Sequence, residues 1–224
     1  MKLEIKNIMR FKIIFLSILI VGFIACRKHG KPTDFDYGKV TNNVYSNAFF
    51  HFEMTLPAEW NVLPRNEAEA QQKQGMKVIA GSNEDMKRAV EKSEVNTANL
   101  LSVFQYRMED LSVTFNPSLI MVAEKVSETR SIKSAADYLS QSRKALLQTP
   151  ISFNSISAGN EMERIGGQLF SKMHVVINGE NGKIHQTYYC FISEGYALCI
   201  VLSYVNDEQK QWLLNSVKSI RFLN

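Results

Sequence analysis

Short turns and apolar runs alternate through the carboxyl-terminal part of the chain, and this pattern restricts the fold more than any other feature. Three apolar runs are each long enough for a strand: Leu169–Ile177, His185–Ile192 and Tyr196–Tyr204. Glycine-containing turns at residues 178–182 and 193–195 separate them, and Gly166-Gly167 forms a tight turn or bulge before the first. Strands joined by such short connections pair antiparallel, because parallel pairing needs a long crossover. The sequence therefore predicts an antiparallel sheet.

Strands are also predicted nearer the amino terminus, where apolar and polar residues alternate with a period of two. One side of the strand predicted over residues 49–56 carries only apolar residues, which are Phe50, Phe52, Met54 and Leu56. Pro57 is expected to end this strand. Further strands are predicted over three segments, which are residues 60–63, 100–106 and 119–126.

Residues 65–94 interrupt the strands with a segment rich in helix-forming residues. The run from Glu67 to Gln74 predicts one helix, which Gly75 is expected to end. Asn83, followed by two acidic residues, predicts the capped start of a second helix. Because apolar residues are few, this insert is expected to lie on the surface.

Two later helices have clear start signals. Ser134, with Asp137 three positions on, resembles a capping box, and Thr149-Pro150 ends that helix. Asn206 and Asp207 begin the last predicted helix. Helices at three places in an otherwise antiparallel pattern predict the α+β class, with an antiparallel β-sheet flanked by helices.

The amino terminus has the three-part organisation of an export signal. A basic segment comes first, with Lys2, Lys6, Arg10 and Lys12. Residues 13–25 are then almost entirely apolar, and the run stops at Cys26. This run is shorter than the roughly 20 residues of a transmembrane helix, and it fits the roughly 7–15 residues of a signal-peptide core.

The residues before Cys26, Phe23-Ile24-Ala25, resemble the lipobox of bacterial lipoproteins, in which a small residue precedes an invariant cysteine. Phe23 departs from the leucine that is usual at its position. The resemblance implies that residues 1–25 are a signal peptide and that Cys26 carries the lipid, which anchors the protein to a membrane of the bacterial cell envelope. An uncleaved signal anchor is the alternative. Residues 26–44 are then predicted to be a lipidated flexible tether, and residues 45–224 the domain.

The positive charge of the whole chain lies mostly in the predicted signal peptide. The chain has 26 basic and 22 acidic residues, of which residues 1–25 contain four basic and one acidic. Residues 26–224 therefore carry 22 basic and 21 acidic side chains, a net charge of +1. No clustered basic face is predicted, so nucleic acid is not an expected partner.

Both ends of the predicted domain resemble PsbP-like domains, a group that includes PsbP of photosystem II, bacterial DcrB-type lipoproteins and a eukaryotic Ran-binding import factor. The first strand leads into Leu56-Pro57-Ala58-Glu59-Trp60, similar to the Leu-Pro-x-x-Trp segment of that group. The chain ends in a glycine-turn hairpin, a helix at Asp207–Val217 and Ser219-Ile220-Arg221-Phe222. The resemblance implies an α/β/α sandwich and a role in binding or assembly. Trp60 and Phe222 are interpreted as packing residues.

Cys190 and Cys199 flank the turn at residues 193–195 and form a candidate disulfide. If the turn has two loop residues, the cysteines face each other as a non-hydrogen-bonded pair, close enough to bond. If Gly195 instead closes a three-residue loop with a bulge, the cysteines point to opposite faces of the sheet. Glycine at the third position favours the three-residue loop and two buried free thiols.

Residue patterns typical of catalytic and metal sites do not occur in the sequence: there is no Gly-x-Ser-x-Gly elbow and no Cys-x-x-Cys. His174 and His185 lack a further ligand at a metal-binding spacing and are interpreted as ordinary strand residues. No catalytic residue, metal or cofactor is expected. The predicted function is a non-catalytic binding or assembly module for another envelope protein. A small-ligand carrier and a hydrolase with a non-standard site are the alternatives.

Overall fold

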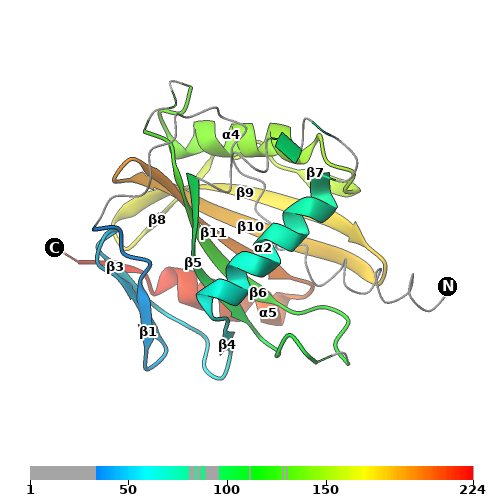
Figure 1. Ribbon diagram of the computed structural model, residues 1–224, viewed down its shortest axis with the longest axis horizontal. Helices are drawn as coiled ribbons and strands as arrows, with labels where there is room; N and C mark the ends of the chain where they lie inside the picture. The colour runs from blue at the N-terminus through cyan, green and yellow to red at the C-terminus, as the bar shows by residue number, and fades with distance from the viewer. Residues whose placement is uncertain are drawn as a thin grey trace.

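The computed structural model describes residues 34–223, apart from positions 81–83, 85, 86, 89–95, 111, 128 and 130. Its main element is an eight-stranded antiparallel sheet in the order β4-β5-β6-β11-β10-β9-β7, with β8 also paired to β9 (Figure 1). The strands are β4 (Asn61–Val62), β5 (Thr97–Phe104), β6 (Ser118–Lys125), β7 (Phe153–Ile156), β8 (Glu161–Ile165), β9 (Gln168–Gly179), β10 (Gly182–Ser193) and β11 (Tyr196–Tyr204).

Tight glycine turns connect the strands of the carboxyl-terminal half, as the sequence predicts. Gly166 and Gly167 join β8 to β9 with φ angles of 55° and 88°, in the left-handed region that glycine adopts without steric cost. Glu194 and Gly195 join β10 to β11 with φ angles of 51° and 76°. Positive φ at both loop residues matches the right-handed twist of the flanking strands, so these two-residue turns set the register of both hairpins.

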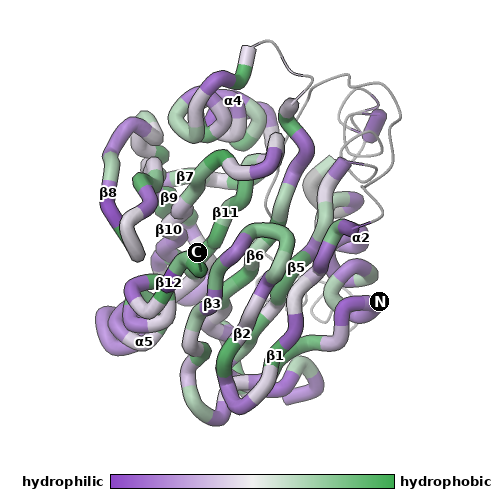
Figure 2. The backbone as a smooth tube through the Cα atoms, turned by 90° about the vertical axis from the view of Figure 1, so that its left-hand side faces the viewer, coloured by the Kyte–Doolittle hydropathy of each residue, from purple (hydrophilic) through white to green (hydrophobic). Residues whose placement is uncertain are grey.

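Strand β11 lies in the middle of the large sheet, and all nine of its residues are buried. Its side chains alternate between two apolar cores, because successive residues of a strand point to opposite faces. Leu198 and Ile200 belong to one core, and Cys199 and Val201 to the other. In Figure 2, green hydrophobic positions accordingly prevail along β11, whereas much of the surface helix α5 (Asp207–Lys218) is purple.

A second, four-stranded antiparallel sheet in the order β1-β2-β3-β12 packs on the core that contains Leu198 and Ile200. Its strands are β1 (Lys39–Thr41), β2 (Val44–Asn47), β3 (Phe52–Thr55) and β12 (Arg221–Phe222). The predicted apolar face is confirmed, since Phe50, Phe52, Met54 and Leu56 are all buried. Phe222 contacts the rings of Phe52, Phe170 and Phe191, as expected for a packing residue.

Three described helices pack on the sheets: α2 (Arg65–Ala80), α4 (Ala135–Leu146) and α5. Helix α4 covers the core that contains Cys199, and α5 packs on the opposite core together with the small sheet. Ser134 caps α4 through the predicted capping box with Asp137, and Asn206 caps α5. Antiparallel sheets flanked by helices confirm the predicted α+β class.

Two sequence expectations differ from the structure. Helix α2 continues through Gly75, because Ala68, Met76 and Ala80 are buried and the helix packs along β5, which offsets the cost of a glycine within a helix. The second helix expected from Asn83 falls largely outside the described residues.

The folded chain also begins before the predicted boundary at Tyr45. Within the expected tether, residues 39–41 form β1, and Phe35 packs against Phe49 and Tyr196. The described part of residues 26–44 is therefore held on the domain, since the apolar surface of Phe35 is covered there. The signal segment and Cys26 lie outside the described residues, and no helix within the described part is long and apolar enough to cross a membrane.

Candidate functional site

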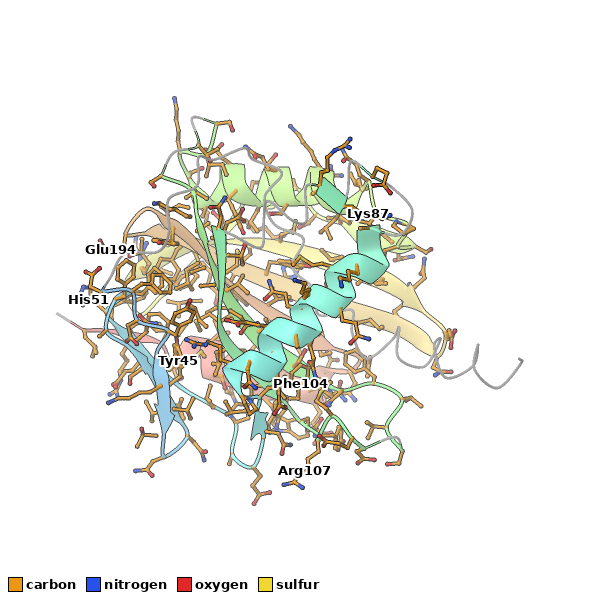
Figure 3. The ribbon with its side chains drawn as sticks, viewed as in Figure 1. Tyr45, His51, Lys87, Phe104, Arg107 and Glu194 are labelled. Atoms are coloured by element: carbon orange, nitrogen blue, oxygen red, sulfur yellow. The ribbon has the colours of Figure 1, made fainter. Side chains whose placement is uncertain are left out.

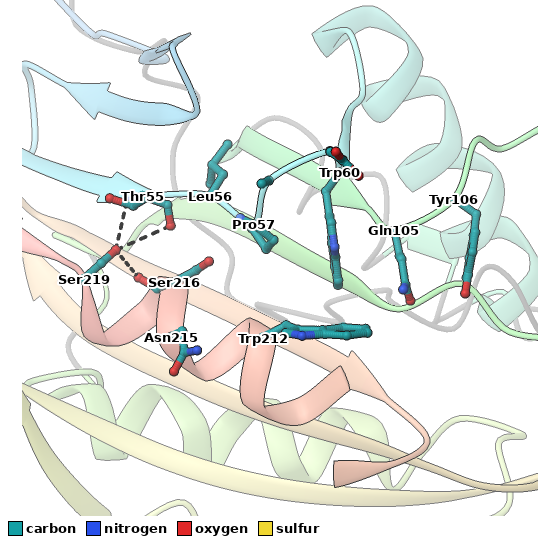
Figure 4. Close-up of a pocket in the computed structure, with 12 residues that line it drawn as sticks. Thr55, Leu56, Pro57, Trp60, Gln105, Tyr106, Trp212, Asn215, Ser216 and Ser219 are labelled. Atoms are coloured by element: carbon teal, nitrogen blue, oxygen red, sulfur yellow. Dashed lines mark hydrogen bonds between the residues drawn. The ribbon is translucent and has the colours of Figure 1, made fainter. Parts of the chain in front are cut away.

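A groove of about 700 Å³ lies where α5 meets the segment between β3 and β4 and the end of β5 (Figure 4). We call it the tryptophan groove, because Trp60 and Trp212 contribute its largest side chains. Its lining residues are Thr55, Leu56, Pro57, Ala58, Glu59, Trp60, Gln105, Tyr106, Trp212, Asn215, Ser216 and Ser219. The groove thus combines aromatic rings with amide and hydroxyl groups.

The two tryptophan rings meet edge to face, with centroids 6.4 Å apart and an interplanar angle of 84°. Trp60 follows Glu59, whose φ of 64° turns the chain after Pro57. Trp212 projects from α5 and remains 36% exposed, although Leu213 beside it is fully buried. An exposed indole held by a second indole is a preorganised apolar surface with one polar N–H on each ring.

A hydroxyl bridge holds the α5 side of the groove against the small sheet. The Oγ atom of Ser219 accepts a hydrogen bond from the Thr55 amide at 2.8 Å and donates to the Ser216 carbonyl at 2.7 Å. These bonds, drawn dashed in Figure 4, join the end of α5 to β3. The two walls that carry Trp212 and Pro57 are therefore fixed relative to each other.

Gln105 supplies an acceptor that no described group satisfies. Its amide donates to the Pro117 carbonyl at 3.0 Å, and its carbonyl accepts from the Asn61 side chain at 3.2 Å, so its backbone is fixed. Its side-chain Oε1 atom, however, is buried without a hydrogen-bond partner. Leaving such an acceptor unpaired costs about 1–3 kcal/mol.

A second groove of about 660 Å³ lies beside the first, and Tyr106 lines both. The Asn116 side chain accepts from the Tyr106 amide at 2.9 Å and donates to the Tyr106 carbonyl at 2.8 Å, which holds this residue at the junction. The second groove carries more charge, from Glu67, Arg107, Glu109 and Asp110. Arg107 lies at the outer edge of the molecule in Figure 3.

The chemistry of the tryptophan groove suits binding. Its lining contains Glu59 and Tyr106 as titratable groups, and it contains no histidine, cysteine or lysine. A nucleophile beside a base, or two carboxyl groups that share a site, would be needed for acid–base or covalent catalysis. The groove instead offers stacking surfaces and hydrogen-bonding groups.

The structure places Cys190 and Cys199 directly opposite each other on β10 and β11, both as buried free thiols. The three-residue loop favoured by the sequence is wrong. Ser193 pairs with Tyr196, and the loop has two residues, because Glu194 adopts the left-handed conformation along with Gly195. Glutamate seldom adopts that conformation, so residue preference alone pointed to the other loop.

Cys199 belongs to a buried polar cluster with Cys190, Tyr138 and Glu124. Burial raises the pKa of Cys199 well above the ordinary value, and the neighbouring Cys190 raises it further. Tyr138 Oη lies 3.1 Å from Glu124 Oε2. Burial raises the pKa of Glu124 to about 8, and the Tyr138 hydrogen bond opposes that rise. The cluster lies under α4, away from the tryptophan groove.

The two strand histidines stay apart. His174 pairs with Thr187, and its ring lies 3.2 Å from the Thr187 hydroxyl and 3.5 Å from a Glu161 carboxyl oxygen. His185 stacks on Tyr204, with ring centroids 5.6 Å apart. In the described part of the chain, no three histidine, cysteine or acidic side chains gather closely enough to hold a metal ion.

Sequence reasoning missed the tryptophan groove. Trp60 was interpreted as a packing residue, and it is half-buried, but it also forms one wall of an open groove. Trp212 lies in the last predicted helix, where no sequence motif distinguishes it. Aromatic residues on an exposed helix face are a weak signal in a sequence, because only the fold brings two of them together.

No protein-family model matches the sequence, and no curated protein matches it. Among solved structures, the chain is similar to the cyanobacterial PsbP (CyanoP) of Synechocystis sp. PCC 6803, with 12% identity, a TM-score of 0.44, and coverage of 80% of this chain and 91% of that one. It is also similar to LpqN, involved in cell envelope biogenesis of Mycobacterium tuberculosis, with 14% identity and a TM-score of 0.42. The match covers 77% of this chain and 83% of LpqN. At these identities the likenesses concern the fold alone.

Proposed function

We propose that this chain is a lipid-anchored bacterial envelope lipoprotein that binds, without catalysis, an extended segment of another envelope protein in the tryptophan groove. The export signal and Cys26 supply the anchor. The pairing of an exposed Trp212 with Trp60 in an open groove carries the binding proposal.

The residues of the groove resemble the energetic centre of a protein interface. Such centres are rich in tryptophan and tyrosine, and they are surrounded by polar residues that exclude water. Here Trp60, Trp212 and Tyr106 are the aromatic residues, and Glu59 and Asn215 are exposed beside them. An extended chain would present apolar side chains to the indoles and backbone N–H groups to the exposed Glu59 and Asn215 side chains, since backbone amides are obligatory donors.

The two alternative functions are less well supported. A small-ligand carrier predicts an apolar cavity between sheet and helices, whereas the described residues there form two packed cores. A hydrolase predicts converging titratable groups in a pocket. The tryptophan groove contains Glu59 and Tyr106 on a surface that is otherwise aromatic, apolar and neutral.

Site-directed photo-crosslinking in intact envelopes tests the binding proposal. A photo-reactive residue at position 215, which is exposed in the groove, is expected to yield a defined adduct. The same residue at position 147, after α4, is the control, because Leu147 is also exposed, at 54%. Adding Trp60→Ala should abolish the adduct from position 215 while circular dichroism stays unchanged. Equal adducts from both positions, or an adduct that survives Trp60→Ala, would contradict the proposal.

Labelling with a radioactive fatty acid tests the anchor separately. Label is expected in the protein and is expected to vanish in Cys26→Ser, because a thioether at that sulfur carries the lipid. If the protein is unlabelled and retains Met1, the proposed lipid anchor is contradicted.

A further inference from the structure

We propose that Cys190 and Cys199 become joined in a disulfide that staples β10 to β11, a covalent modification site independent of the tryptophan groove. The structure holds both as free thiols, and the bond would form when the exported chain meets an oxidising compartment. The proposal rests on the proposed export for its oxidising environment, and on the hairpin register for its geometry.

The register brings the two residues into the geometry that a disulfide needs. Ser193 and Tyr196 close the two-residue turn, and Cys190 pairs with Cys199 three positions further along each strand. Pairs alternate along an antiparallel ladder, so the cysteines form a non-hydrogen-bonded pair with Cα atoms about 4.5 Å apart. Disulfides span Cα separations of roughly 4.4–6.8 Å, so the backbone accommodates the bond.

Both side chains point to the same side of the sheet. Cys190 and Cys199 both belong to the core beneath α4, and they pair directly across β10 and β11. Residues opposite each other in a ladder share a face, which the three-residue loop would have prevented. The thiols are therefore side by side before any bond forms.

The hairpin brings the two thiols together before the core closes. Only the eight residues 191–198 separate the two cysteines, and hairpins form in about 1–10 μs, ahead of long-range packing. Once α4 has docked, neither thiol is exposed, and burial raises the pKa of Cys199, which removes the reactive thiolate. The same burial protects a disulfide that has formed from reductants.

The chemistry is thiol–disulfide exchange with an oxidant of the protein-disulfide class. The thiolate of one cysteine attacks a sulfur of the oxidant, forms a mixed disulfide and releases one oxidant thiolate. The thiolate of the second cysteine then attacks the cysteine sulfur of the mixed disulfide and releases the second oxidant thiolate. The pair loses two protons and two electrons, and the oxidant disulfide is reduced to two thiols.

The decisive experiment uses the full-length chain purified from envelopes without reductant, alkylated under denaturing conditions and digested for mass spectrometry. The expected result is a linked peptide pair containing Cys190 and Cys199, lighter by two hydrogen atoms than the reduced pair and alkylated only after reduction. Two alkylated thiols in molecules that carry lipid on Cys26 would overturn the proposal.

The same digest separates failure of export from failure of the disulfide. If Cys26 is unmodified and Met1 is present, the chain has not been exported, and refolding in glutathione redox buffer becomes the test. A bond formed there supports the geometry, and two free thiols overturn it.

The double variant Cys199→Ala/Val201→Cys is the matched control. It keeps two buried thiols on one face, since Val201 lies in the same core, but moves one thiol to a diagonal position. Diagonal Cα atoms lie about 7–8 Å apart, beyond disulfide reach. This variant should stay alkylatable without reductant. A bridge in it as complete as in the wild type would show that register does not direct the bond, and would overturn the proposal.

Discussion

The phenol oxygen of Tyr138 in α4 lies 3.1 Å from a carboxyl oxygen of Glu124 in β6, and both residues are buried. The hydrogen bond ties the helix to the sheet. Burial nevertheless raises the pKa of Glu124 to about 8, because the charged carboxylate loses more stabilisation from water than the hydrogen bond of Tyr138 provides. This pair makes the stability of the domain depend on pH.

Stability is expected to fall as pH rises from about 4.5 to about 8. Across this window the folded protein keeps a proton on Glu124 that the unfolded chain releases, so the unfolded state binds fewer protons. Below the window the carboxyl is neutral in both states, and above it the cost is fully present. Within the window, each rise of one pH unit lowers the free energy of unfolding by about 1.4 kcal/mol. Urea unfolding at several pH values measures this slope.

Glu124→Gln should remove most of that slope and stabilise the protein near pH 8 by a few kcal/mol, since the amide oxygen can still accept from Tyr138 without carrying charge. Glu180→Gln is the control, because Glu180 is exposed in the turn before β10. An unchanged slope in Glu124→Gln would mean that other groups dominate the pH dependence.

Gly166→Ala should destabilise the domain more than Gly167→Ala. Both glycines have positive φ, so each alanine costs about 1–2 kcal/mol of backbone strain. A Cβ atom at Gly166 would also lie only 2.5 Å from the Ile220 carbonyl oxygen, closer than van der Waals contact allows, whereas one at Gly167 meets open space. The expected difference is about 1–3 kcal/mol by urea unfolding. Equal losses would indicate that the β8–β9 turn shifts away from Ile220.

Trp212→Ala should weaken partner binding far more than folding. Its ring is partly exposed, so we expect a stability loss of only about 1 kcal/mol, mostly from the contact with Trp60. Thermal unfolding and photo-crosslinking from position 215 measure the two effects on one protein. Leu147→Ala, which truncates another exposed apolar residue, should change neither. A normal adduct with Trp212→Ala would remove this tryptophan from the interface.

Reductant should lower the unfolding free energy of protein purified from envelopes by at most about 3 kcal/mol. This value is the loop-closure entropy for the ten residues from Cys190 to Cys199, and native strain reduces it. Cys199→Ala should unfold identically with and without reductant. If reductant leaves the unfolding free energy of the wild type unchanged, the two thiols are free and the prediction is wrong.

Several elements were predictable because their signals lie within a few residues. The Ser134–Asp137 capping box, the alternation from Phe50 to Leu56 and the Gly166-Gly167 turn all appear where expected. Each rests on a local hydrogen bond, a backbone preference or a side-chain period. The continuation of α2 through Gly75 was not predictable in this way, since its packing on β5 outweighs local helix propensity.

The amino-acid sequence by itself determined the α+β class and the positions of the turns, because these depend on short-range patterns. Tertiary structure decided the rest. It paired Cys190 with Cys199 through the left-handed backbone of Glu194, and it brought Trp60 to Trp212 from distant segments. The contact between Trp60 and Trp212 forms only when the sheets and α5 pack together, so no local preference specifies it.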